Sequence, residues 1–103
     1  MQSGWQVLAC FAAGLFLTNG IPHFVKGLCG DRFPTPFAKP PGKGLSSATL
    51  NVAWGIGNFA ASLLLAHAGQ LLCGPALGRW IAAAAAAIFA LGTSAQFARK
   101  EKE

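Results

Sequence analysis

Three long stretches of this sequence contain almost no charged side chain. They run from 5 to 21, from 50 to 72 and from 76 to 97, and Arg79 is their only charged residue. A helix needs about 20 mainly apolar residues to cross the hydrocarbon core of a bilayer. The sequence therefore predicts an all-α polytopic membrane protein, one transmembrane domain over 1–103, with spans at about 5–25, 49–72 and 76–97.

The basic residues distinguish the two sides of the predicted membrane. Seven of the eight lie in the first connection, at about 26–47, or in the C-terminal tail: Lys26, Arg32, Lys39, Lys43, Arg99, Lys100 and Lys102. Only Arg79 lies on the other side. Because Lys and Arg collect on the cytoplasmic side, we expect a bacterial inner-membrane protein with its N-terminus outside and its C-terminus in the cytoplasm.

The net charge of +5 raises the question of a nucleic-acid partner. The basic residues flank apolar spans and form no dense patch with interleaved aromatic side chains, so we expect no nucleic-acid binding. Membrane lipid is the expected partner of these charges, at about 1 kcal/mol per basic residue near an anionic surface. Three thin helices bury little among themselves, so a homo-oligomer or a larger membrane partner is also expected.

The first span contains a proline near its cytoplasmic end. Pro22 removes one helical hydrogen bond and clashes with the carbonyl group of Thr18, which predicts a helix kinked at Pro22. His23 follows directly and lies, in the predicted topology, near Asn19 and the start of the second span at Asn51. A neutral imidazole at this place can bond to an asparagine, bind a ligand or ligate a metal.

Metal and cofactor sites have little support in the sequence. His23, Cys29 and Asp31 are close along the chain, but their spacing matches no strong zinc pattern, so no metal is expected. His67 lies toward the opposite membrane face from His23, which disfavours a haem held by both. The only acids are Asp31, Glu101 and Glu103, and no nucleotide-binding or hydrolase motif is present. We therefore expect no enzyme activity and no cofactor.

The first connection is rich in proline. Four prolines between 33 and 42 forbid a helix but restrict the backbone, which predicts an ordered Pro-rich cytoplasmic loop. In one interpretation Phe33 and Phe37 dip into the headgroup zone while Lys39 and Lys43 hold phosphates. In the other, the loop is a lid folded back beneath the helices to close a site.

The second span carries the polar residues of greatest interest. Four residues share one face of the predicted helix by their spacing: Asn51, Gly55, Asn58 and Ser62. Trp54 lies beside them. Asparagines within the hydrocarbon bond to other helices, and small residues allow the close approach that such bonds need. The face is therefore either a helix-packing surface or part of a ligand-binding surface.

The stretch Asn19-Gly20-Ile21-Pro22-His23-Phe24, together with Phe33-Pro34-Thr35-Pro36-Phe37, resembles small uncharacterised bacterial integral membrane proteins. The resemblance covers about the first half of the chain and brings no activity with it. It implies that Asn19, His23, Asn51 and the loop stretch act together.

Three classes of function follow from these features. The first is an accessory or scaffolding subunit that acts through helix packing. The second is a binder or carrier of a small amphipathic ligand, lipid or quinone-like, in an inner-leaflet pocket. The candidate ligand-binding residues are His23, Asn19, Asn51, Trp54 and Asn58. The third is a small oligomeric exporter, disfavoured because no carboxylate lies within the spans.

Overall fold

The computed structural model describes residues 3–99, which form three helices: α1 (Gly4–Leu28), α2 (Ala48–Ala68) and α3 (Ala76–Phe97). Each helix is long and apolar enough to cross a membrane, so the predicted all-α fold with three spans is confirmed. The positions of Lys100 and Lys102 lie outside the described residues. Pro22 lies inside α1, which continues to Leu28, and the kink at this proline stays a prediction.

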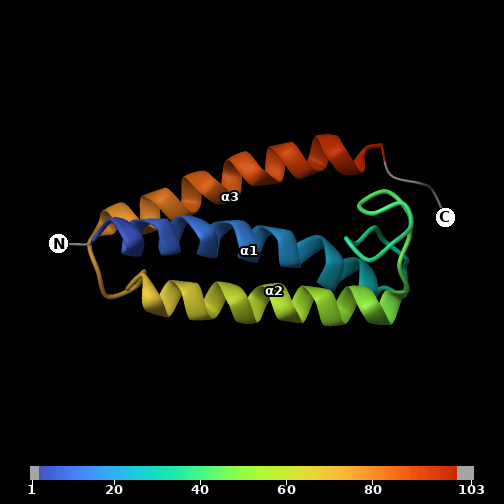
Figure 1. The fold of residues 1–103 in the computed structure, drawn as a ribbon, viewed down its shortest axis with the longest axis horizontal. Helices are drawn as coiled ribbons and strands as arrows, with labels where there is room; N and C mark the ends of the chain where they lie inside the picture. The colour runs from blue at the N-terminus through green and yellow to red at the C-terminus, as the bar shows by residue number, and fades with distance from the viewer. Residues whose placement is uncertain (1–2, 100–103) are drawn as a thin grey trace.

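The first helix lies between the other two. α1 packs against both α2 and α3, whereas no Cα pair of α2 and α3 comes within 8 Å. Figure 1 shows α1 beside the start of α3 at one end of the bundle and close to α2 at the other. We call the end that carries residues 29–47 the loop end, and the end that carries residues 69–75 the turn end. At the loop end, residues 29–47 fill the space that opens between α1 and α3.

Glycines bring α1 close to both neighbours. A Cβ atom on Gly55 of α2 would lie 2.9 Å from the backbone nitrogen of Phe24, and one on Gly14 of α1 would clash with the carbonyl oxygen of Ala82 in α3. Only a residue without a side chain fits at these two contacts. Such close approach favours van der Waals contact and interhelical hydrogen bonds within a bilayer.

The buried face of α2 is more polar than its exposed face. The buried residues of α2 are Asn51, Gly55, Asn58 and Ser62, the four that the sequence places on one face. Leu63 and Leu64, in contrast, are each 72% exposed. In water this arrangement would leave large apolar side chains uncovered, whereas lipid chains cover them in a bilayer.

The connection between α2 and α3 is a tight turn. α2 ends at Ala68 rather than at the predicted residue 72, because Gly69 caps the helix and Gln70 adopts a positive φ of 54°. Arg79 stabilises the turn, since its Nη1 donates to the carbonyl oxygens of Leu71, Leu72 and Gly74 at 3.0, 3.2 and 3.2 Å.

The first connection folds inward at the loop end. Phe33 and Ser46 pair as in an antiparallel sheet, with N–H to O=C distances of 3.2 and 3.0 Å. The hydroxyl groups of Thr35 and Ser46 lie 2.6 Å apart in the interior. Ser47 then caps α2, because its Oγ accepts a hydrogen bond from the backbone nitrogen of Leu50 at 3.0 Å.

Candidate functional site

Asn51 holds the loop, α1 and α2 together at the loop end. Its side chain is fully buried, and Nδ2 donates to the carbonyl oxygens of Phe33, Ser46 and Ser47 at 2.9, 3.2 and 3.0 Å. Three carbonyl acceptors around one nitrogen fix the orientation of the amide, because the amide oxygen would be repelled there. The oxygen Oδ1 therefore faces α1.

This orientation determines the state of His23. Nδ1 of His23 lies 2.8 Å from Oδ1 of Asn51. Since Oδ1 can only accept, Nδ1 carries the proton, and in the neutral ring the lone pair is then on Nε2. The structure contains no hydrogen-bond partner for Nε2 among residues 3–99. His23 therefore presents a hydrogen-bond acceptor that no described side chain uses.

Three aromatic rings surround His23 in edge-to-face contact. The ring centroids of Phe33, Trp54 and Phe97 lie 5.4, 6.5 and 6.1 Å from that of the imidazole, with interplanar angles of 80°, 78° and 89°. Such pairs contribute about 0.5–1.5 kcal/mol each beyond the area that they bury. They leave His23 2% exposed and hold its ring in one orientation.

A second pair of amides lies nearer the middle of the bundle. Nδ2 of Asn19 donates to Oδ1 of Asn58 at 3.0 Å, and Nδ2 of Asn58 donates to the carbonyl oxygen of Trp54 at 2.7 Å. Further along, Oγ of Ser62 donates to the carbonyl oxygen of Ala13 at 2.8 Å. The bonds of Asn19 and Ser62 join α1 to α2, and they provide a packing role for this part of the polar face.

A cavity of about 170 Å³ adjoins His23, and we call it the loop-end cavity. All three helices and the loop contribute to its wall, and no charged side chain lines it. The lining residues are Asn19, His23, Pro34, Thr35, Pro36, Gly42, Trp54, Phe89, Thr93, Gln96 and Phe97. Nε1 of Trp54 is buried and has no hydrogen-bond partner among the described residues. A buried indole N–H normally finds an acceptor, and none of the described residues supplies one here.

A second cavity, of about 270 Å³, is bounded in part by the same residues, and we call it the side cleft. It shares Asn19, Trp54 and Phe89 with the loop-end cavity. Leu15 and Phe16 extend its lining along α1. The two spaces together offer a polar end and an apolar continuation.

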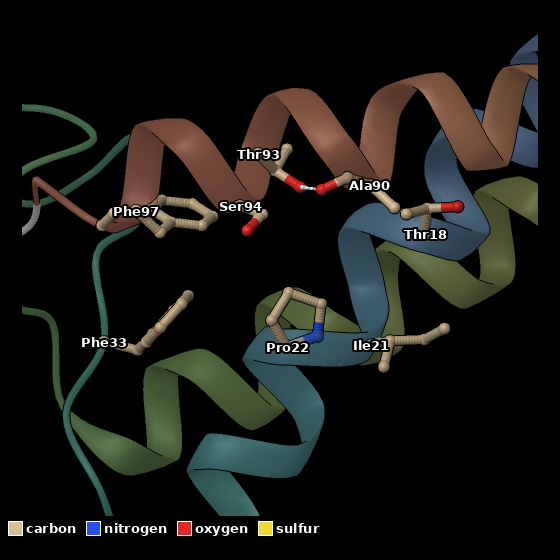
Figure 2. A pocket seen from close by; sticks show the side chains of 9 residues that line it. Thr18, Ile21, Pro22, Phe33, Ala90, Thr93, Ser94 and Phe97 are labelled. Carbon is tan, nitrogen blue, oxygen red and sulfur yellow. Dashed lines mark hydrogen bonds between the residues drawn. The ribbon is translucent and has the colours of Figure 1, made fainter.

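An open groove of about 500 Å³ between α1 and α3 lies beside the same aromatic rings. In Figure 2, Pro22 and Ser94 lie on its two walls, and Phe33 and Phe97 lie at its loop end. Thr18 and Thr93 donate their hydroxyl groups to carbonyl oxygens of their own helices, Gly14 and Ala90. The groove therefore offers a mainly apolar surface that suits an acyl chain.

The structure brings together all five predicted ligand-binding residues. His23, Asn19 and Trp54 line the loop-end cavity, while Asn58 lines the side cleft and bonds to Asn19. Asn51 lines neither space and bonds to His23. Of the four headgroup candidates, Lys39, Lys43 and Phe37 are exposed. Phe33 differs, because it is 5% exposed and packs on His23 and Phe97 in the interior.

The contribution of α3 was not expected from the sequence. Phe89, Thr93, Gln96 and Phe97 close one side of the loop-end cavity. The third span is largely alanine, and its few larger residues carry no pattern that predicts which of them face the site. Among residues 3–99, no group of three histidine, cysteine or acidic side chains lies close enough to hold a metal ion.

Comparisons with protein-family models, curated proteins and solved structures gave no match, so the site is interpreted from its own geometry.

Proposed function

We propose that this protein binds a small amphipathic molecule within a membrane. The head group lies in the loop-end cavity, and the chain extends into the side cleft. The unpartnered indole N–H of Trp54 carries this proposal, because a buried donor without an acceptor is costly and lies beside a cavity of ligand size. His23 supports it with an acceptor on the wall of the same cavity.

A second candidate is an accessory or scaffolding subunit that acts through helix packing. The uncovered surface of α3 favours it: Trp80, Ile88 and Leu91 are 74%, 70% and 75% exposed. Lipid chains cover such side chains equally well. The polar side chains of α2 bond within the chain and leave little for a protein partner, so we place ligand binding first. An ion-coupled exporter gains no support, since α1, α2 and α3 contain no carboxylate side chain.

We also propose that the loop end faces the cytoplasm of a bacterial cell. This end carries Lys26 in the last turn of α1, three basic residues of the first connection and Arg99, whereas Arg79 is at the turn end. Lys39 and Lys43 are exposed and would contact lipid phosphates there. The cavity then lies in the inner leaflet.

Co-purification tests the proposed function. The protein is extracted gently with its surrounding lipid, and small molecules that remain after exchange into fresh detergent are identified by mass spectrometry. We expect one amphipathic species near one per chain. His23→Ala should lose it, while His67→Ala, which changes an exposed histidine near the turn end, should keep it.

Folding must be compared in the same samples. We expect His23→Ala to insert and migrate like the wild type, and Pro22→Ala serves as the control for a disturbed helix. A stoichiometric protein partner with no retained small molecule would favour the scaffolding candidate instead.

A further inference from the structure

We propose that the head group in the loop-end cavity is an uncharged ring that bears a hydroxyl group, as in a phenol or a hydroquinone. The inference rests on the proposed function and names the chemical class of its ligand. It uses three properties of the cavity: the free acceptor, the volume and the absence of charge.

The acceptor on His23 selects the hydroxyl group. Because Asn51 turns Oδ1 toward His23, Nδ1 donates and Nε2 is left as an acceptor. A ligand satisfies it only with an O–H or N–H donor. An ether or a carbonyl oxygen at this place would direct its own lone pair at the lone pair of Nε2, which is repulsive. A quinol therefore fits better than the matching quinone.

The volume accommodates one ring. The cavity measures about 170 Å³. A cavity of about 150 Å³ in another protein holds benzene, so a six-membered ring with one or two oxygen substituents fits. Trp54 and Phe97 bracket His23 with edge-to-face rings, and both line the cavity, where an aromatic ligand would find further contacts of this kind.

The lining excludes an anionic head group. No Lys or Arg side chain lines the cavity, and Lys39 and Lys43 are exposed on the loop outside it. A phosphate there would lose its hydration without gaining a cation, which is strongly unfavourable. A neutral second oxygen on the ring, in contrast, would accept the indole N–H of Trp54.

The test compares three probes on the full chain in lipid nanodiscs: 4-nonylphenol, its methyl ether 4-nonylanisole, and dodecylphosphocholine. Empty nanodiscs give the background. Trp54 fluorescence reports binding in a Trp5→Phe/Trp80→Phe variant. We expect the phenol to bind about tenfold more tightly than the ether, since the ether cannot donate a hydrogen bond. Dodecylphosphocholine should bind no better than the ether.

Nitrogen NMR of His23 provides a second readout that a general loss of folding would not imitate. In a His67→Gln variant labelled with ¹⁵N-histidine, we expect protonated Nδ1 and an unprotonated Nε2 in the free protein. 4-Nonylphenol should shift the Nε2 resonance, and 4-nonylanisole should not.

Equal affinities for phenol and ether, or a proton on Nε2 in the free protein, would overturn the inference and leave the proposed function standing. Preferential binding of dodecylphosphocholine would overturn the uncharged class alone. If none of the probes binds, the inference fails, and the co-purified species decides the proposed function separately.

Discussion

At the scale of single residues, Asn51 determines how the candidate site is built. One amide joins the start of α2 to both ends of the loop and to His23. Its two roles are linked. Because Nδ2 donates to the carbonyl groups of the loop, Oδ1 faces the imidazole and accepts its hydrogen bond. Asn58 has a simpler role, with one bond across to Asn19 and one within its own helix.

We therefore predict that Asn51→Leu and Asn58→Leu differ in their effect on stability. Asn51→Leu leaves Nδ1 of His23 without its acceptor, and an unsatisfied buried group costs about 1–3 kcal/mol. It also removes the side-chain donor from three carbonyl groups, which keep their backbone partners. Asn58→Leu removes one interhelical bond, at about 0.6 kcal/mol on average in membrane proteins. Equilibrium unfolding in mixed micelles measures both, and equal losses would contradict the importance given to Asn51.

The prediction has a spectroscopic control. Asn51→Leu should also remove the preference of His23 for a proton on Nδ1, whereas Asn58→Leu should preserve it. The ¹⁵N resonances of His23 distinguish the two variants even where both are destabilised.

At the scale of the helices, close approach depends on particular glycines rather than on small residues in general. Gly55 faces the backbone of α1 at Phe24. A Cβ atom on Gly57, in the same helix, would have no other atom within 4 Å. The two positions have the same residue type and opposite environments. They form a matched pair.

We predict that Gly55→Ala destabilises the bundle and that Gly57→Ala does not. The added methyl group at Gly55 must push α1 and α2 apart, which costs about 1–3 kcal/mol, and it would stretch the bond between Asn19 and Asn58. At Gly57 the alanine meets open space and favours the helix slightly. Thermal unfolding of both variants checks this, and a loss at Gly57 would indicate that its face is covered by another chain.

Helix positions were more predictable than loop contacts for a physical reason. The spans and the buried face of α2 follow from residue spacing, since a helix repeats every 3.6 residues. The sequence predicts the end of α2 four residues beyond its position in the structure, because Leu71 and Leu72 are apolar. Gly69 and Gln70 turn the chain before these two leucines. No spacing rule reveals that Phe33 packs on Phe97, because that contact depends on how the loop returns to α3.

At the scale of the whole molecule, the two ends of the bundle are chemically different. Cys29 is exposed at the loop end and Cys73 is exposed at the turn end. Cys10 is buried in contact with the turn, where it donates to the carbonyl oxygen of Gly69 at 3.4 Å. The chain therefore carries its own pair of probes for orientation.

We predict that a membrane-impermeant maleimide labels Cys73 in intact spheroplasts and labels Cys29 only after permeabilisation. This follows from the proposed orientation, in which the basic residues retain the loop end in the cytoplasm. Mass spectrometry of the labelled peptides identifies the modified cysteine, and Cys73→Ser gives the background. Labelling of Cys29 before permeabilisation would reverse the proposed orientation.

The central place of α1 also has a consequence for biosynthesis. The side-chain hydrogen bonds that connect helices in the described residues run between α1 and α2, and none reaches α3. A ribosome completes these two helices and the loop first. The hairpin can therefore satisfy its buried amides before the last helix leaves the translocon. α3 can then join by close contact at Gly14 and Ala82, where its residues close one side of the cavity.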